Sequence, residues 1–152
     1  MNLAPLFRYP DSPLGIECEN AQLDAFANEI NALDLASQQS TYTATFDLAP
    51  SCTPYLGIHL FGEEDPGRAR LMVGLKLAYQ RLGIDSAPEL PDHIAEVLAF
   101  ADRATSEERD ELVRFVLLPA LTKMHAILGP TNNPYRHLVA AALQQVSPGG
   151  AS

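Results

Sequence analysis

Apolar residues recur three or four positions apart along most of the chain, which is the spacing of amphipathic α-helices. The clearest stretch runs from about Asn20 to Leu35, where Asn20 can act as the N-cap. The same spacing predicts helices over about 54–61, 66–82, 91–101, 105–128 and 134–146. The pattern therefore predicts an all-α domain of about seven helices over residues 1–146, with a disordered tail at 147–152.

The segment from Ser37 to Phe46 gives conflicting local signals. Tyr42, Ala44 and Phe46 alternate with threonines, and this alternation with β-branched residues favours a β-strand. However, no other part of the chain offers a partner strand, and a single strand is not stable. We therefore expect a helix here, against the local propensity.

Prolines and capping residues predict where helices begin and where one is interrupted. Thr53-Pro54, Asp65-Pro66 and Asn133-Pro134 each put a capping residue before a proline, a pair typical of a helix start. Thr105 and Glu108 have the spacing of a capping box. Pro119 falls inside a helical pattern, so we expect it to kink or split that helix.

Composition and charge narrow the classes of function. The chain has 152 residues, 47% of them hydrophobic, which suits one domain with a sizeable core. Its net charge of −9 argues against non-specific binding to nucleic acid or to an anionic membrane, and suits a partner with a basic segment. The pattern predicts neither a secretory signal nor a membrane-spanning helix. Cys18 and Cys52 are expected to be free thiols, with a single disulfide as the alternative.

One stretch, YTATFDLAPSCTPYLGIHLFG, concentrates large side chains that could bind a ligand. Tyr42 and Phe46 are four apart, as are Tyr55 and His59 on the other side of a proline-containing corner. If these two pairs face each other, they line an apolar groove with the Asp47 carboxylate and the His59 imidazole at its edge. The alternative is that these aromatic residues belong to the core.

Most catalytic motifs are missing from the sequence. It contains no glycine-rich phosphate loop, no GxSxG, no HExxH and no metal-ligand spacing. Asp92-His93 is the one local pair of an acid and an imidazole, and its simplest interpretation is a helix cap followed by an exposed or partly packed histidine.

Positive charge is concentrated in the predicted helix over 66–82, which carries four of the ten Lys and Arg residues. Arg68 and Arg70 lie at the start of this helix, where the helix dipole disfavours cations. Either they belong to a solvated face with acidic neighbours, or one of them contacts a phosphate or a carboxylate.

Several segments together resemble a known family. YTATFDL, LGIHLFG, RARLMVGLKLAYQRLG and ELPDHIAEVLAF are similar in order and spacing to the nitrate reductase molybdenum cofactor assembly chaperones, the delta-subunit branch of the TorD-like redox-enzyme maturation proteins. The resemblance runs from about Tyr9 to Leu143, and Glu89, Asp92 and His93 match the family's E-x-x-D-H pattern. The chain departs from the family at Arg68-Ala69, where an Arg-Gly step is usual, which leaves the particular client enzyme open.

The resemblance implies an all-α, cytoplasmic, non-catalytic chaperone without a cofactor of its own. Such proteins hold the N-terminal segment of a molybdenum-containing catalytic subunit until its bis-molybdopterin guanine dinucleotide is inserted. The client segment is typically a basic amphipathic helix, which an acidic protein with an apolar groove should favour. We expect a monomer or weak dimer with these peptide-binding residues: Tyr42, Phe46, Asp47, Tyr55, His59, Glu89, Asp92 and His93.

Two other functions remain open from the sequence. The chain could be a structural or regulatory subunit that stays in an oxidoreductase complex. It could also be an enzyme that uses Asp92-His93, but no nucleophile, metal site or phosphate cradle accompanies that pair.

Overall fold

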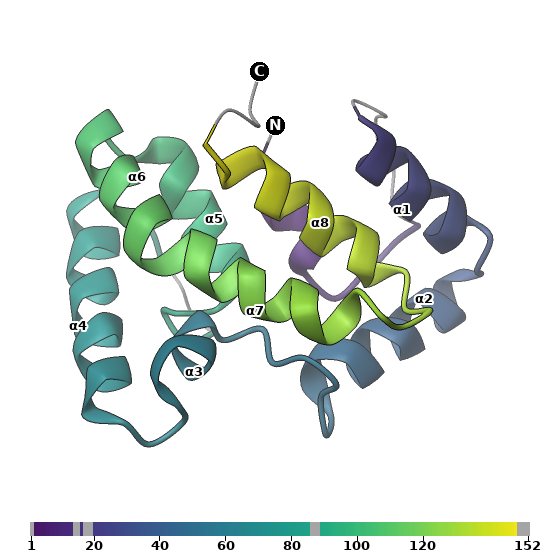
Figure 1. The fold of residues 1–152 in the computed structure, drawn as a ribbon, viewed down its shortest axis with the longest axis horizontal. Coiled ribbons are helices and arrows are strands. Elements are labelled where there is room, and N and C mark those ends of the chain that lie inside the picture. The colour runs from purple at the N-terminus through teal and green to yellow at the C-terminus, as the bar shows by residue number, and fades with distance from the viewer. Residues whose placement is uncertain (1, 14–15, 17–19, 86–88, 149–152) are drawn as a thin grey trace. The chain divides into compact units, whose positions relative to one another are not determined.

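The structure is a computed structural model that describes residues 2–13, 16, 20–85 and 89–148 (Figure 1). These residues contain eight α-helices and no β-strand, which confirms the predicted all-α class. The helices are α1 (Ala21–Asn31), α2 (Leu35–Tyr42), α3 (Leu56–Phe61), α4 (Pro66–Arg81), α5 (Ile94–Arg103), α6 (Ser106–Leu112), α7 (Leu118–Leu128) and α8 (Tyr135–Val146). A 3-10 helix, η1 (Ala4–Phe7), and two π-helical turns, η2 (Thr43–Asp47) and η3 (Val113–Leu117), complete the set. Most of the predicted tail, from residue 149 on, lies outside the described residues.

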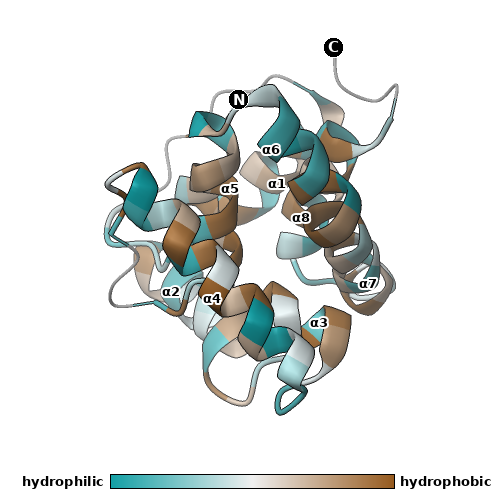
Figure 2. Ribbon diagram, turned by 90° about the vertical axis from the view of Figure 1, so that its left-hand side faces the viewer, coloured by the Kyte–Doolittle hydropathy of each residue, from teal (hydrophilic) through white to brown (hydrophobic). Residues whose placement is uncertain are grey.

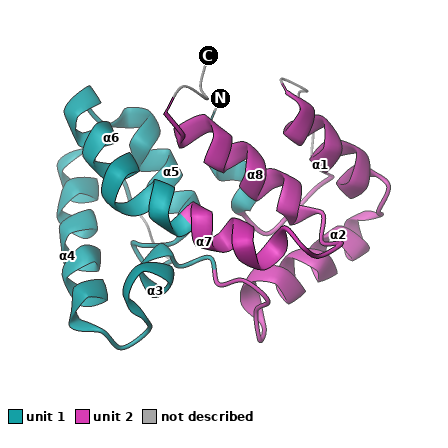
Figure 3. Cartoon of the chain, in the orientation of Figure 1, with its two compact units in different colours: residues 1–7, 54–120 teal, residues 8–53, 121–152 magenta. Residues whose placement is uncertain are grey.

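The chain divides into two compact units (Figure 3). Unit 1 consists of Met1–Phe7 and Pro54–Ala120, and unit 2 of Arg8–Thr53 and Leu121–Ser152. The last of the three boundaries between them, after Ala120, falls inside α7. The two units are described one at a time below.

In unit 1, α3 packs against α4 and η3, and α5 packs against η1 and α6. Apolar side chains drive this packing, because Phe7 of η1 and Ile94 and Val97 of α5 are fully buried. Tyr79 of α4 lies against Phe100 of α5, with ring centroids 5.4 Å apart. Unit 1 therefore has an apolar core of its own, to which η1, α4 and α5 contribute.

In unit 2, α1 packs along α8 around a cluster of aromatic rings. Tyr135 of α8 lies at the centre, with its ring centroid 5.3 Å from Phe26, 4.9 Å from Phe46 and 6.1 Å from Tyr42. Such tilted and edge-to-face contacts add to the stabilisation that burial alone provides. Tyr9 lies at the margin of the cluster, edge-on to Tyr42.

The ambiguous segment before residue 47 is helical, as predicted against its propensity. It forms α2 and continues into the π turn η2. Threonine hydroxyls support it locally: Thr41 donates to the carbonyl of Ser37 and Thr45 to the carbonyl of Thr41. Asn133 also donates to the hydroxyl of Thr45 from the loop before α8. These bonds keep the threonines compatible with a helix.

Most of the predicted helix starts are confirmed. Asn20, Asp65 and Thr105 accept backbone hydrogen bonds as N-caps, and Thr105 with Glu108 forms the full capping box. The prediction for Thr53-Pro54 was wrong, because α3 begins at Leu56 after an extended Tyr55. The carbonyl of Pro54 is taken up by a long-range hydrogen bond from the amide of Ile94, which keeps this residue out of the helix.

The interruption predicted at Pro119 takes the form of the π turn η3, which separates α6 from α7. In this turn the amide of Leu118 donates to the carbonyl of Val113, one residue further back than in an α-helix. Pro119 then lies in the first turn of α7, where a missing amide proton costs little.

Candidate functional site

The site is organised by two extended residues, Tyr55 and His93, which form an isolated antiparallel bridge. The amide of Leu56 donates to the carbonyl of Asp92 at 2.9 Å, and the amide of Ile94 donates to the carbonyl of Pro54 at 2.8 Å. Each bond satisfies an amide at a helix start. The bridge therefore places the LGIHLFG segment next to the ELPDHIAEVLAF segment.

Asp92 is fully buried beneath this bridge, and its carboxylate accepts three hydrogen bonds. Its carboxylate accepts from Arg68 through Nε at 2.9 Å and Nη2 at 3.3 Å, and from the amide of Gly57 at 3.1 Å. Arg68 is itself buried. The sequence left open whether an arginine of this helix contacts a carboxylate; Arg68 does, and the carboxylate is the chain's own Asp92.

Gly57 is required by this close approach. A Cβ atom at residue 57 would lie 2.6 Å from Oδ2 of Asp92 and 2.8 Å from Cγ of Arg68. Both distances are shorter than van der Waals contact, so any larger residue would displace the ion pair. Gly57 is thus part of the carboxylate's binding pocket, although it carries no side chain.

His93 has the capping role that the sequence suggested for Asp92. It is the N-cap of α5, and its Nδ1 accepts from the amide of Ala95 at 3.1 Å. Asp92 cannot cap the helix because its carboxylate is turned to Arg68 and Gly57. Since Nδ1 accepts a hydrogen bond, a neutral His93 carries its ring proton on Nε2. The ring is buried and lies edge-on to Tyr55, with centroids 5.4 Å apart.

Tyr55 connects the buried ion pair to the surface. Its hydroxyl donates to Oε2 of Glu89 at 2.9 Å, and the Arg68 guanidinium lies 5.7 Å from its ring centroid. Tyr55 and Glu89 are both half-buried, and the next residue, Leu90, is exposed. The surface end of the site therefore presents an aromatic ring, a carboxylate and an apolar side chain together.

Tyr79 of α4 anchors the loop before α5. The Tyr79 hydroxyl donates a hydrogen bond to the carbonyl of Pro91 at 2.7 Å. Burial raises the pKa of the Tyr79 hydroxyl well above its usual value, and the nearby carboxylates of Glu96 and Asp92 raise it further. The hydroxyl therefore stays protonated and remains a donor to the loop.

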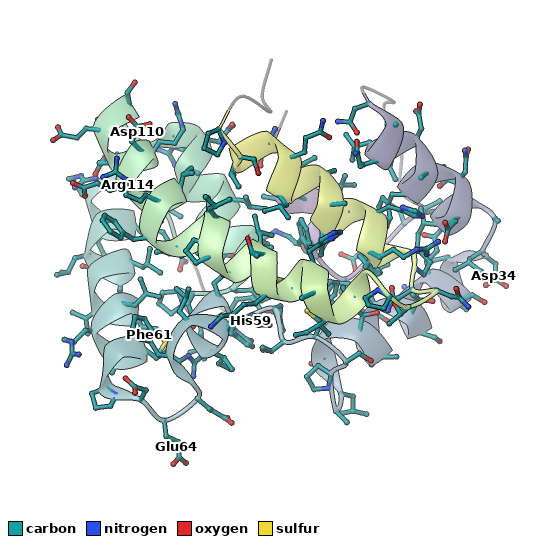
Figure 4. The ribbon with its side chains drawn as sticks, in the orientation of Figure 1. Asp34, His59, Phe61, Glu64, Asp110 and Arg114 are labelled. Atoms are coloured by element: carbon teal, nitrogen blue, oxygen red, sulfur yellow. The ribbon has the colours of Figure 1, made fainter. Side chains whose placement is uncertain are left out.

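The α3 helix contributes further side chains to this region of unit 1. His59 is half-buried on α3, and Phe61 lies between α3 and α4 (Figure 4). Phe61 closes over Gly67 at the start of α4, where a Cβ atom would lie 2.6 Å from the Phe61 ring. Five of the predicted residues therefore lie in unit 1: Tyr55, His59, Glu89, Asp92 and His93. Tyr55 contacts Glu89 and His93 directly.

The other three predicted residues lie in unit 2. Tyr42 and Phe46 are buried, with ring centroids 5.2 Å apart, and both pack on Tyr135. Asp47 is exposed at the end of η2. That Tyr42 and Phe46 face Tyr55 and His59 across the corner remains a prediction.

Gly57 and Arg68 were absent from the predicted site. The signal for Arg68 was a cation at the unfavourable end of a helix, which indicates a compensating carboxylate. The signal for Gly57 was a glycine inside a short helix, where it lowers stability unless a neighbour needs the space.

The described part of the chain contains no group of three His, Cys, Asp or Glu side chains that could hold a metal ion. None of its helices is both long and apolar enough to cross a membrane.

Comparison with known proteins identifies a family for most of the chain. The model of the family described as "Nitrate reductase delta subunit" matches residues 11–141. This range contains α1 to α7 and all of the residues of the site described above. The comparison with curated proteins gave no match.

Proposed function

The chain belongs to the nitrate reductase delta subunit family, a family of assembly chaperones, and on this premise we propose that it is a chaperone for one molybdoenzyme. It binds the N-terminal segment of the molybdenum-containing catalytic subunit in the cytoplasm and holds that subunit for cofactor insertion. It acts by binding, without catalysis and without a cofactor of its own, as a monomer or weak dimer. The observation that carries this proposal is the family match over residues 11–141.

We place the contact with the client at the surface end of the site in unit 1. Tyr55 offers a ring face for apolar client side chains, and Glu89 offers a carboxylate for a client Arg or Lys. His59 on the neighbouring α3 adds a further polar group. Tyr42, Phe46 and Asp47 of unit 2 remain proposed peptide-binding residues as well.

Asp92 and His93 support the contact with the client indirectly, by holding the backbone next to Glu89 in place. Both are buried, and their hydrogen bonds to Arg68, Gly57 and Ala95 fix the backbone between Glu89 and α5. The family pattern E-x-x-D-H then has two parts: a surface carboxylate that meets the client, and a buried pair that holds it in position. Preorganisation of this kind reduces the entropic cost of binding a flexible peptide.

Charge supports a basic client segment. The chain carries a net charge of −9, so a basic peptide is attracted to it over the range of the Debye length, about 8 Å at physiological salt. Such attraction raises the association rate and disfavours acidic segments at the same surface.

A second candidate function follows from the word "subunit" in the family's description. A structural subunit would remain in the mature enzyme in equal amount, whereas a chaperone leaves before the enzyme is complete. Quantifying the chain in the purified active enzyme separates the two.

The proposal is tested by recovering the client. Purification of the tagged chain from its native cell under molybdenum limitation should recover a molybdoenzyme catalytic subunit without its cofactor. A synthetic peptide with that subunit's N-terminal sequence should then displace the subunit. A catalytic subunit that matures with a full cofactor content in cells that lack the chain would refute the proposal.

A further inference from the structure

Helix α4 is apolar on two sides. Leu75 and Tyr79 are buried on the inner side, as expected for a helix that packs on a core. Val73 and Leu77, however, are 60% and 62% exposed, and their spacing of four residues puts them on one outer face. Apolar and polar residues accordingly alternate along the ribbon of α4 (Figure 2). Two large aliphatic side chains in adjacent turns form a small exposed apolar patch that a partner helix can cover.

Basic side chains flank this apolar pair. Arg70 and Lys76 are exposed on either side of Val73, and neither makes an ion pair within the described residues. Arg81 at the end of the helix is paired with Glu108. The helix sequence, PGRARLMVGLKLAYQR, contains no Asp or Glu, although the chain has 19 acidic residues.

The same face is sterically open. A Cβ atom at Gly74, which follows Val73, would have no neighbouring heavy atom within 4 Å. A partner helix can therefore approach the backbone of α4 closely at this point, since a glycine leaves room for side chains from the other helix.

We infer that this face is a docking surface for an acidic amphipathic helix of a partner protein. We call it the α4 outer face and define it by Arg70, Val73, Lys76 and Leu77. Apolar side chains of the partner pack on Val73 and Leu77, and its carboxylates pair with Arg70 and Lys76. Charge complementarity argues for this occupant: Arg70 and Lys76 flank the apolar pair, α4 has no acidic residue of its own, and more distant charges of the chain are largely screened at physiological salt.

The inference goes beyond the proposed chaperone function, because the client segment proposed for Tyr55 and Glu89 is basic. The α4 outer face takes a segment of the opposite charge at a different place in unit 1. A nucleic acid would also be attracted to cations, but two aliphatic side chains at the centre of the face offer no stacking surface for bases.

Two synthetic peptides test the inference directly. Both carry leucines at the same helical spacing, and the flanking positions are all Glu in one peptide and all Lys in the other. The acidic peptide should bind the full chain and shift the backbone amide resonances of α4, including that of Gly74. Substituting Val73→Ser and Leu77→Ser together should weaken its binding by roughly tenfold or more. The Arg70→Glu/Lys76→Glu variant should lose the acidic peptide and gain affinity for the basic one.

A matched control distinguishes binding at the α4 outer face from non-specific binding to any exposed apolar side chain. Leu48 is 75% exposed and lies outside α4, so Leu48→Ser should leave binding of the acidic peptide unchanged. All the substituted side chains are exposed, and circular dichroism checks that each variant folds. If the serine variant does not fold, the charge-reversed variant carries the test alone.

Three results would overturn the inference. The first is that the acidic peptide binds no more tightly than the basic one, and the second is that it binds the charge-reversed variant as tightly as the wild type. The third is a stable dimer of the chain, seen by sedimentation, that dissociates on the Val73→Ser/Leu77→Ser change. In that case a second copy of the chain covers the α4 outer face.

Discussion

Arg68 and Asp92 are 24 residues apart in the sequence and form a buried ion pair, with Nε of Arg68 2.9 Å from Oδ2 of Asp92. The same oxygen accepts from the amide of Gly57, so one carboxylate ties the starts of α3, α4 and α5 together. Removing one member of a buried pair leaves an uncompensated charge, which costs more than the pair itself contributes. The pair therefore fixes the arrangement on which the proposed client surface depends.

Asp92→Asn should destabilise unit 1 strongly, because Arg68 would remain buried without a negative partner. We expect a loss of about 3–5 kcal/mol in the free energy of unfolding, measured by urea denaturation. Asp110→Asn is the control, since Asp110 is exposed on α6 (Figure 4) and should change stability by less than about 0.5 kcal/mol. Adding Arg68→Met to Asp92→Asn should recover part of the loss, since the lone charge is then removed. An Asp92→Asn protein of wild-type stability would contradict the buried ion pair.

Gly57→Ala should destabilise the protein by about 1–3 kcal/mol, because the added methyl group overlaps Oδ2 of Asp92. Gly74→Ala is the matched control: its Cβ meets nothing within 4 Å, and alanine favours a helix by about 1 kcal/mol over glycine. The two glycine-to-alanine changes should thus shift the thermal melting temperature in opposite directions. Equal shifts would mean that Gly57 is not a point of close contact.

Cys52 should be unreactive in the folded protein. It is a buried, free thiol, and burial raises its pKa to about 12, so almost no thiolate exists at pH 8. In a Cys18→Ser background, a thiol reagent at pH 8 should label Cys52 only after urea is added. Rapid labelling of the folded protein would show that Cys52 is accessible.

Glu29 should make the contact between α1 and α8 sensitive to acid. Its carboxylate accepts from Arg136 through two nitrogens and contacts His137, and these partners lower the pKa of Glu29. A carboxyl group whose pKa is lower in the folded state stabilises the protein above its unfolded value of about 4.3, and this contribution disappears as the pH falls through the folded value.

Comparing wild type with Glu29→Gln measures this effect. The difference in melting temperature between the two proteins should be largest near neutral pH and should shrink below about pH 4.3. The pair is partly exposed, so Glu29→Gln should lower the free energy of unfolding by less than about 1 kcal/mol even near neutral pH. A constant difference across this range would show that the charge of Glu29 does not stabilise the contact.

Features set by neighbouring residues could be predicted from the sequence. The capping box at Thr105 and the N-cap at Asn20 depend on residues within one helical turn, and both are present. The helix through Thr45 was predicted because no partner strand existed, which is an argument from the whole chain. Its π-helical ending was not predicted; in that turn Asn133 donates to Thr45 from far along the chain, a contact that no local pattern reveals.

The site could be predicted only in part, for the same reason. Glu89, Asp92 and His93 were found by their resemblance to a family pattern, but the pattern does not say which of them is buried. The sequence suggested that Asp92 caps a helix, and the structure gives that role to His93. Partners that are distant in the sequence determine which residue caps α5, because the carboxylate of Asp92 is already bound to Arg68 and Gly57.

Titration calorimetry with a synthetic peptide of the client's N-terminal segment tests the central claim most directly. Tyr55→Ala and Glu89→Gln should each weaken binding by about 1–3 kcal/mol, or roughly 5- to 150-fold, because they remove the aromatic face and the carboxylate. Glu64→Gln, which neutralises an exposed carboxylate before α4 (Figure 4), should leave the affinity unchanged. Thermal melts establish that each variant is folded. A folded Tyr55→Ala/Glu89→Gln protein that binds the peptide as tightly as the wild type would contradict the account.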